Sequence, residues 1–328
     1  MQIKNIFVTG GAGYVGAVLV PRLLDENCQV TVLDLMIYGE GVLPDHPRLK
    51  VVKGDIRDLA LLKRALPGHD AVIHLACISN DPSFELNPDL GKSINLDAFR
   101  PLVEISRASG VERFVYASSS SVYGIKEEKD VHEETPLEPL TDYSQFKADC
   151  EKILNEYESP DFTTTTIRPA TVCGYSPRQR LDVVVNILTN LAYRKREITV
   201  FGGEQLRPNI HIGDMVESYL IVLNAARETV AGKVYNAGYE NQSVRELAET
   251  VKGVVGYDVR LITLPTDDNR SYHISSKKIR QELGFKAQYM IKDAVVDLLR
   301  AFELGQLPNS LDDEIYFNIR RMQSLQLS

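Results

Sequence analysis

Residues 3–16 read IKNIFVTGGAGYVG, an apolar run that passes directly into a glycine-rich turn. The run Ile3–Val8 predicts a first strand, and Gly13–Glu26 has the pattern of the helix that follows it. Glycines let a backbone approach a pyrophosphate closely, and the N-terminus of a helix attracts its negative charge. The residues predicted to contact a dinucleotide here are Gly10, Gly13, Tyr14 and Val15.

A carboxylate ends the second predicted strand, Gln29–Asp34. Its distance from the glycines is the one expected for an acceptor of the adenosine ribose hydroxyls. Leu35 and Met36 follow it, with no arginine among them, and a carboxylate repels a 2′-phosphate. The pattern therefore favours NAD over NADP. Asp55 and Ile56, after a third strand, are placed to hold the adenine, although Asp55 alone fits a helix cap equally well.

The first half goes on alternating β-branched runs with helical patterns, which is typical of a parallel sheet with crossover helices. The strands are apolar throughout, as expected when both faces of a sheet are covered. Further strands are predicted at Lys50–Lys53, Ala71–Leu75, Arg113–Ser118 and Thr163–Ile167, and helices at Leu59–Leu66, Asn87–Ala108 and Tyr143–Tyr157. Pro21 and Pro101 fall inside predicted helices, and we expect a kink at each.

The pattern of predicted strands and helices changes after Arg168. Shorter strands are predicted at Ile198–Phe201, Asn209–His211, Lys233–Asn236 and Val259–Ile262, and helices at 182–195, 214–227, 243–255, 276–283, 291–303 and, in the tail, 311–328. Ser243 and Glu246 have the spacing of a capping box. We predict an α/β protein with a Rossmann-type doubly wound parallel sheet: residues 1–168 bind the dinucleotide, and a smaller, intermixed domain of residues 169–328 binds substrate, with some segments returning to the first domain.

Tyr143 and Lys147 lie four residues apart and so share one face of their helix. A free tyrosine has a pKa near 10, and a nearby ammonium together with a positive nicotinamide ring lowers that pKa toward the range of a general base. The run Ser118–Ser121 follows the fifth strand, whose carboxyl end lines the predicted cleft. A hydroxyl there can orient the reacting oxygen toward the tyrosine.

Together these motifs resemble the extended short-chain dehydrogenase/reductase superfamily, in its branch of NAD-dependent nucleotide-sugar epimerases and dehydratases, and the UDP-galactose 4-epimerase type in particular. The resemblance covers nearly the whole chain. It implies a catalytic set of Ser119, Tyr143 and Lys147, and further cofactor contacts at Leu75, Ala76 and Asn95. It also implies that Arg207 and Arg270 bind a substrate diphosphate. Additional candidate substrate contacts are Ser120, Arg178, Arg180 and Asn186.

Two departures from sister families narrow the reaction. Sugar 4,6-dehydratases carry an acid and a base directly after the catalytic hydroxyl, where this chain has Ser120 and Ser121. The 3,5-epimerases use a cysteine near the position of Ser121. The remaining chemistry is hydride transfer, and we favour a 4-epimerase over a 4-dehydrogenase or ketoreductase. A non-catalytic NAD sensor is the alternative from another class. UDP, GDP, CDP and dTDP stay open, because Ala170 and Thr171 stand where UDP-galactose 4-epimerases usually have asparagine.

Composition excludes several other classes of function. The net charge is −8 with no basic tract, so neither nucleic acid nor an anionic membrane is an expected partner. The four cysteines are scattered and form no cluster with histidine, so no metal site is expected. No signal peptide or membrane-spanning run is apparent, which predicts a cytoplasmic protein. The helices at 87–108 and 143–157 are expected to form a homodimer interface, as is common in the family that the chain resembles.

Overall fold

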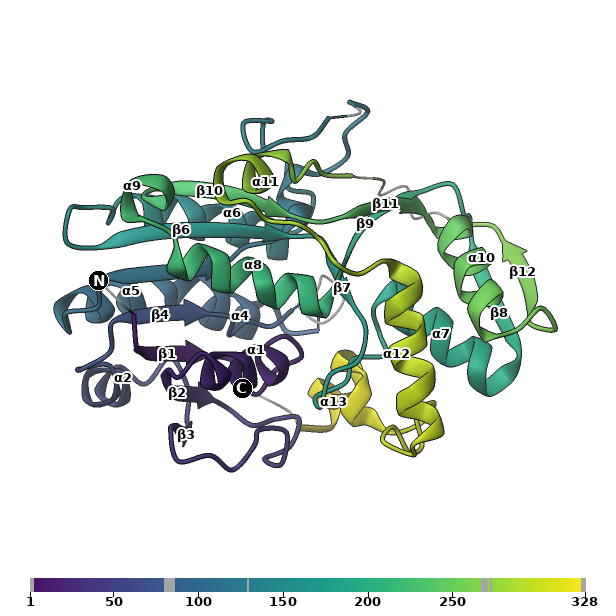
Figure 1. Cartoon of the computed structure of the whole chain (residues 1–328), viewed down its shortest axis with the longest axis horizontal. Coiled ribbons are helices and arrows are strands. Elements are labelled where there is room, and N and C mark those ends of the chain that lie inside the picture. Colours follow the sequence, from purple (N-terminus) through teal and green to yellow (C-terminus); the bar gives the residue numbers. More distant parts are fainter. Residues whose placement is uncertain (1–2, 80–85, 129, 267–270, 272, 326–328) are drawn as a thin grey trace.

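The computed structural model describes residues 3–79, 86–128, 130–266, 271 and 273–325. Within them, parallel strands form a seven-stranded sheet in the order β10-β6-β5-β4-β1-β2-β3 (Figure 1). The strands are β1 Asn5–Thr9, β2 Gln29–Asp34, β3 Leu49–Lys53, β4 Ala71–His74, β5 Arg113–Ala117, β6 Thr163–Pro169 and β10 Lys233–Ala237. The strand order reverses at β1, as in a doubly wound Rossmann-type sheet. The predicted fold class is therefore confirmed.

Helices cover both faces of this sheet, which explains why its strands are apolar on both sides. α1 (Gly16–Asp25) and α8 (Ile212–Asn224) pack on the face turned toward the viewer in Figure 1, over Ile6 and Val8. α2 (Leu59–Ala65), α5 (Phe99–Ala108) and α6 (Asp142–Asn155) pack on the opposite face, over Phe7. Successive side chains of β1 thus enter two separate hydrophobic cores.

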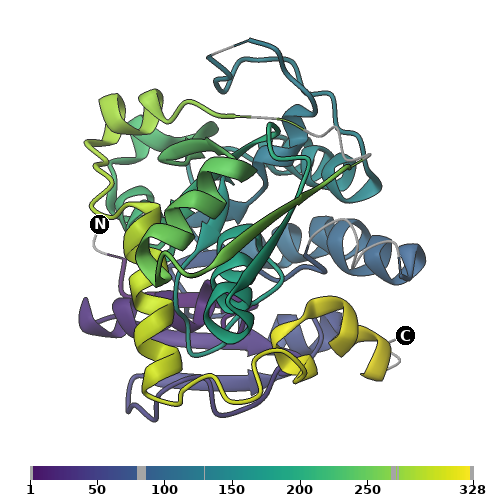
Figure 2. The ribbon, with the colours of Figure 1, turned by 90° about the vertical axis from the view of Figure 1, so that its right-hand side faces the viewer.

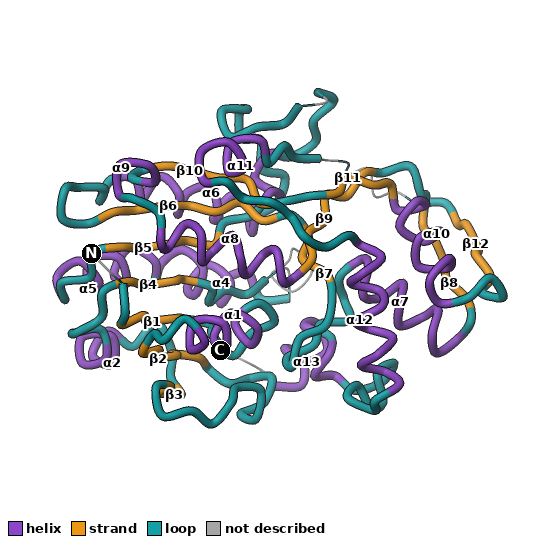
Figure 3. The backbone as a smooth tube through the Cα atoms, in the orientation of Figure 1, coloured by secondary structure: helices purple, strands orange, loops and turns teal. Residues whose placement is uncertain are grey.

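The second half adds a smaller α/β layer beside the main sheet, at the right of Figure 3. β8 (Glu197–Phe201) and β12 (Arg260–Leu264) pair in parallel there. They share a core with α7 (Val184–Lys195), α10 (Val244–Val255) and α12 (Ile291–Glu303). A three-stranded sheet lies between this layer and the main sheet and has the order β11-β9-β7, with β7 Thr171–Cys173, β9 Leu206–His211 and β11 Glu240–Ser243.

The two halves of the chain are intermixed, as predicted. β10 comes from the second half and pairs with β6 at the edge of the main sheet. Two short helices, α9 (Arg227–Val230) and α11 (Lys277–Leu283), lie near it. The last helix, α13 (Asn318–Leu325), lies against the first half in both Figure 1 and Figure 2, where it is yellow. The division into two domains at residue 168 stays a prediction.

Helix boundaries depart from the predictions in one instructive place. The single helix predicted over 87–108 is wrong: the chain forms α4 (Pro88–Lys92), a π-helical turn (Ser93–Asp97) and α5. Pro101 consequently falls in the first turn of α5, where its missing N–H would have had no partner within the helix, so no kink is needed. Pro21 lies deeper inside α1, and that helix continues through it.

Other local predictions hold in detail. The capping box is confirmed, since Ser243 accepts from the Glu246 backbone N–H at 3.2 Å and Glu246 accepts from the Ser243 N–H at 2.7 Å. Asp58, and not Asp55, caps α2 by accepting from the Leu61 N–H at 2.9 Å. β7, β11 and α9 were not predicted, because three or four residues carry no periodic signal.

Candidate active site

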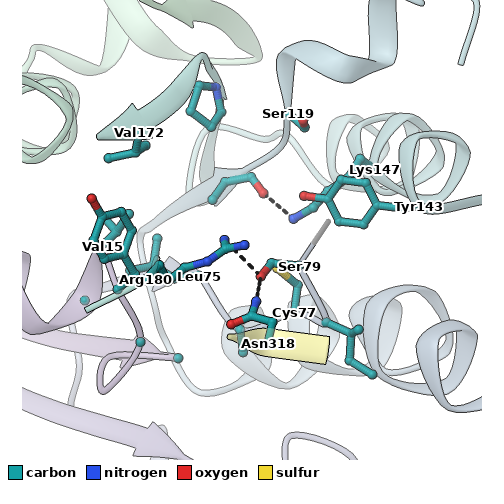
Figure 4. Close-up of a pocket in the computed structure, with 18 of the residues that line it drawn as sticks. Val15, Leu75, Cys77, Ser79, Ser119, Tyr143, Lys147, Val172, Arg180 and Asn318 are labelled. Carbon is teal, nitrogen blue, oxygen red and sulfur yellow. Dashed lines mark hydrogen bonds between the residues drawn. The ribbon is translucent and has the colours of Figure 1, made fainter. Parts of the chain in front are cut away.

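A cavity of about 520 Å³ opens where β1, β4 and β5 end, between the two halves of the chain (Figure 4). Parallel sheets of this type bind ligands outside the carboxyl ends of their strands, at the point where the strand order reverses. From the first half, the predicted residues that line it are Gly10, Gly13, Tyr14, Val15, Asp34, Asp55, Ile56, Leu75, Ala76, Ser119, Ser120, Tyr143 and Lys147. From the second half, Arg178, Arg180 and Arg207 line it.

The glycine-rich turn presents backbone to the cavity because no side chain fits there. Gly10 has a φ of +72°, and a Cβ added to it would lie 2.5 Å from the backbone nitrogen of Ala76. A Cβ on Gly16 would lie 2.5 Å from the carbonyl oxygen of Gly11. Glycine is thus required for the turn to pass so close to the end of β4 and to lead into α1. This is the cradle expected for a phosphate at a helix N-terminus.

Asp34 ends β2 and holds the turn in place. Its two carboxylate oxygens accept from the Ala12 N–H at 3.0 Å and from the Met36 N–H at 2.8 Å. Burial raises the pKa of Asp34 above its usual value, and these two N–H donors act in the opposite direction. A carboxylate has about four acceptor positions, so two bonds from the backbone leave room for the hydroxyls of a ribose.

Two of the predicted cofactor residues are engaged elsewhere. Asn95 stands outside the cavity lining: its amide accepts from the Ile78 N–H at 2.8 Å and donates to the Ile78 carbonyl at 2.9 Å. It therefore fixes the loop after β4. Asp55 lines the cavity, but its carboxylate also accepts from the Arg57 guanidinium, at 2.7 and 3.0 Å. Burial alone would raise the pKa of Asp55, and the Arg57 donors lower it.

The predicted catalytic residues Ser119, Tyr143 and Lys147 lie on the same side of the cavity (Figure 4). Lys147 is 4% exposed and donates to the Ala117 carbonyl at 2.7 Å. Its Nζ lies 5.8 Å from the centre of the Tyr143 ring. Both residues are carried by α6, which begins where Thr141 Oγ1 accepts from the Ser144 N–H. The end of β5 and one helix thus bring an ammonium, a phenol and a serine hydroxyl to the same cavity wall.

A row of hydroxyls connects Ser119 to the start of that helix, and it was not predicted. Ser119 Oγ lies 2.8 Å from Ser121 Oγ, which accepts from Ser144 Oγ at 3.0 Å. Ser144 Oγ lies 2.9 Å from Thr141 Oγ1. These contacts fix Ser119 relative to the helix that carries Tyr143. The two residues after Ser119 are Ser120 and Ser121, which carry neutral hydroxyls and no carboxylate.

The predicted substrate residues are only partly brought together. Arg207 on β9 lines the cavity and donates to the Leu206 carbonyl at 3.0 Å. Asn186 is fully buried behind the wall, where its amide accepts from the Gly174 N–H at 3.0 Å and donates to the Arg180 carbonyl at 2.8 Å. It supports the loop that carries Arg180. Arg270 lies outside the described residues.

The side chain of Tyr14 joins the two halves of the chain. Its hydroxyl is buried, donates to the Gly174 carbonyl at 2.7 Å and accepts from the Asn186 amide at 3.0 Å. Burial raises the pKa of Tyr14, so this phenol stays neutral. Ser176 adds a second connection by donating to the Tyr14 carbonyl at 2.7 Å. The glycine-rich turn and the segment 174–180 are consequently held as one unit.

Comparison with known proteins identifies the family. The sequence matches the NAD dependent epimerase/dehydratase family over residues 6–238. The chain belongs to this family. It is 29% identical to UDP-glucose 4-epimerase of Lactobacillus helveticus, over 89% of this chain and 94% of that one.

Solved structures resemble the chain over similar lengths. UDP-glucose 4-epimerase of Thermotoga maritima superposes with a TM-score of 0.84 at 24% identity, covering 92% of this chain and 99% of that one, which supports the fold. The dTDP-glucose 4,6-dehydratase of Streptomyces venezuelae, solved with NAD bound, gives a TM-score of 0.82 at 25% identity and covers 91% of this chain and 97% of that one.

NAD is the cofactor of this family, and the cavity fits it. The glycine turn leaves space for a close backbone approach, and the Asp34 carboxylate keeps acceptor positions that would suit a ribose. Arg178 and Arg180 line the same space, and some of their guanidinium nitrogens have no acceptor among the described residues. Among the described residues, no group of three or more His, Cys, Asp or Glu side chains could hold a metal ion. Among the same residues, no helix is long and apolar enough to cross a membrane.

Replacing Asp34 with alanine is expected to weaken NAD binding by about tenfold or more, because the ribose hydroxyls lose a charged acceptor. NADP binding should weaken far less, since the repulsion of its 2′-phosphate disappears and the cation of Arg178 lies within electrostatic range of this position. Titration calorimetry with both dinucleotides measures the change. Glu26→Ala, which removes an exposed carboxylate at the end of α1, is the control. An unchanged preference would place cofactor selection elsewhere.

Several residues at the cavity have no counterpart among the sequence predictions. Tyr38, Ser79, Asn318 and Met322 all line it. Tyr38 and Ser79 lie in loops after β2 and β4, where a sequence pattern indicates a loop but no contact. Asn318 and Met322 belong to α13. The tail was predicted as one amphipathic helix over 311–328, but the structure has a 3₁₀ turn at Glu314–Tyr316 and α13 only at Asn318–Leu325. No local signal connects the end of the chain to a site built by its beginning.

His74 and His211 have structural surroundings. Thr9 Oγ1 lies 2.6 Å from Nδ1 of His74, and burial, followed by the charge of Lys147, lowers the pKa of His74 to about 3. That histidine is therefore neutral. His211 accepts from the Gly213 N–H at 3.1 Å at the start of α8 and lies 3.1 Å from Asp297. Neither histidine lines the cavity.

Proposed function

We propose that this protein is an NAD-dependent nucleotide-sugar 4-epimerase. The observation that carries the proposal is the meeting of Ser119, Tyr143 and Lys147 at one cavity wall, followed by two serines in place of an acid and a base. This set can remove and return a hydroxyl proton but offers nothing for expelling a neighbouring hydroxyl. A 4-keto sugar formed here can only be reduced again or released.

The proposed reaction begins with Tyr143. Its phenolate oxygen takes the proton of the C4 hydroxyl, while the C4 hydrogen leaves with its electron pair, so the carbon is oxidised to a ketone. NAD, when bound in this cavity, would supply the acceptor and later the donor of that hydride. Ser119 donates a hydrogen bond to the same oxygen and so keeps it directed at Tyr143. After the keto sugar turns over, the hydride is added to the opposite face and Tyr143 gives the proton back.

Lys147 makes the phenolate possible. Its ammonium is almost fully buried and held by the Ala117 carbonyl, near the Tyr143 ring. A positive charge in a poorly solvated position favours the negative form of a neighbouring acid. The positive charge of an oxidised nicotinamide would add to this effect. The two positive charges would favour the phenolate at the stage when the sugar hydroxyl loses its proton.

A nucleoside diphosphate sugar is the proposed substrate class. We assign Arg207, which lines the cavity from the second half, to the diphosphate, with Arg270 as a proposed second ligand. Ser120 lines the cavity next to Ser119 and is proposed to contact the sugar. The relative from Lactobacillus helveticus is named for UDP-glucose, which supports this class. The identity of the base is left to experiment. A homodimer and a cytoplasmic location stay predictions.

A nucleotide-sugar 4-dehydrogenase or ketoreductase would use the same residues, and a panel experiment separates the two. Purified protein is incubated with UDP-, GDP-, CDP- and dTDP-linked sugars without added cofactor, and NADH absorbance and product NMR are recorded. A C4 epimer without stoichiometric NADH is expected. NADH that accumulates with a keto sugar would make the protein a dehydrogenase. No turnover of any sugar would favour the third alternative, an NAD sensor.

A further inference from the structure

Two buried arginines from the second half reach into the cofactor side of the cavity. Arg178 is 3% exposed, and its guanidinium carbon lies 3.4 Å from the centre of the Tyr38 ring. Arg180 extends past Val15 and Leu75 toward Ser79, apart from Tyr143 and Lys147 (Figure 4). Arg180 therefore lies near the glycine-rich turn, and both cations act electrostatically on the Tyr14 phenol of that turn.

The hydrogen bonds of these arginines are incomplete. Arg180 Nε donates to Asp182 at 2.9 Å and Nη1 donates to Ser79 at 3.3 Å, but Nη2 has no acceptor among the described residues. Arg178 Nη2 donates to Asn318 at 2.6 Å, while Nε and Nη1 likewise have none there. Buried guanidinium N–H groups are rarely left without an acceptor. Two arginines that line the cavity thus keep three buried nitrogens without an acceptor among the described residues, and this leaves their positive charge incompletely compensated.

The local charges agree with that reading. Asp182 is the ion-pair partner of Arg180 and is also within electrostatic range of Arg178. Asp34 is likewise within range of Arg178, but it already accepts two backbone N–H bonds. Burial, with a further contribution from Arg180, lowers the pKa of Arg178 to about 10. Arg178 is still charged at neutral pH, and holding a second cation close to it is unfavourable. A diphosphate would relieve that repulsion.

The C-terminal helix completes this group. Asn318, its first residue, accepts from Arg178, donates to Ser79 at 2.8 Å through its amide, and donates to Asp182 at 2.8 Å through its backbone N–H. One turn later, Met322 is 7% exposed and lines the cavity. Met322 belongs to the same hydrophobic core as Ile56, a residue predicted to contact the adenine. α13 thus closes the part of the cavity expected to hold the adenosine.

We propose that Arg180 binds the diphosphate of the dinucleotide opposite the glycine-rich turn, and that Arg178, Asn318 and Met322 close the adenosine end, so that NAD is retained between turnovers. This deepens the proposed function and rests on it, because an epimerase regenerates its NAD in every cycle and has no need to exchange it. It assigns Arg178 to the cofactor, where the sequence predicted a substrate contact.

The test measures NAD binding with no nucleotide sugar present, so it is independent of the identity of the reaction. NAD that copurifies with the full chain is quantified, and release of isotopically labelled NAD is followed by exchange with unlabelled NAD. Titration calorimetry of the apo protein then compares ADP-ribose, which carries the diphosphate, with adenosine, which does not. The variants are Arg180→Gln and Asn318→Ala. Arg320→Gln, on the exposed side of α13, is the matched control.

Arg180→Gln is expected to weaken the binding of NAD and of ADP-ribose by about tenfold or more, because a charge-assisted contact to the diphosphate is lost. The affinity for adenosine should stay unchanged. Asn318→Ala should release NAD several times faster, and Arg320→Gln should change nothing. Unchanged NAD affinity and release in Arg180→Gln would overturn the proposal. If Arg180→Gln does not fold, Arg180→Lys, which keeps the charge but loses the fork, should weaken ADP-ribose by a smaller factor, and no change would overturn the proposal equally.

Discussion

Tyr143→Phe is expected to lower turnover by about a hundred- to ten-thousandfold, which is the usual contribution of a general acid–base group. The phenylalanine ring fills the same space beside Lys147, so the wall of the cavity is kept and only the proton acceptor is lost. NAD affinity should stay nearly unchanged. The measurement is kcat on the nucleotide sugar that the panel identifies, with NAD titration on the same preparation.

A second phenol provides the control for Tyr143. Tyr157 lies just beyond the end of α6 and donates to Glu104 at 2.7 Å, far from the cavity lining. Tyr157→Phe removes the same atom from the same stretch of chain and should leave kcat unaltered. Turnover of Tyr143→Phe within about tenfold of the parent would remove Tyr143 from the role of proton acceptor.

The second large effect concerns stability. Glu151→Ala is expected to lower the free energy of unfolding by about 3–5 kcal/mol, the range found when one partner of a buried ion pair is deleted. Arg168 is 4% exposed and donates to Glu151 at 2.6 and 3.0 Å. Ser118, next to the catalytic serine, also donates to Glu151. Urea denaturation of both proteins measures the difference.

Two further variants separate the buried charge from other effects. Glu151→Leu combined with Arg168→Met removes both charges, and much of the lost stability should return because no cation is left unpaired. Glu40→Ala breaks an exposed pair with Lys53, in which both side chains are more than 60% exposed, and should leave stability unaltered. A loss below about 1 kcal/mol in Glu151→Ala would show that Arg168 finds another partner or reaches water.

The parts of the site that could be predicted from sequence are those with local causes. A strand, a glycine turn and a helix occupy consecutive residues, and the steric need for Gly10 follows from that arrangement. Tyr143 and Lys147 meet because a helix brings every fourth residue to the same face. The capping box joins Ser243 to Glu246, which is only three residues further along the chain. Periodicity and spacing carry such information directly.

The parts that could not be predicted depend on contacts between distant residues. Arg180 meets Ser79, 101 residues away, and Asn318 meets Ser79 across 239 residues. Nor does the identity of a polar residue reveal which way it faces: Asn95 and Asn186 were expected at ligands, and the structure places both behind the wall, satisfied by backbone groups. The orientation of a side chain depends on its packing against distant residues, and no short stretch of sequence specifies that packing.

The edge strand of the main sheet has a consequence for how the protein is made. β10, at residues 233–237, covers the outer side of β6, and without it the unpaired N–H and C=O groups of β6 would be open to other chains. A ribosome must therefore deliver more than two thirds of the polypeptide before the sheet can be completed. Relatives that exchanged only their first halves by recombination would inherit a sheet whose last strand belongs to a different parent.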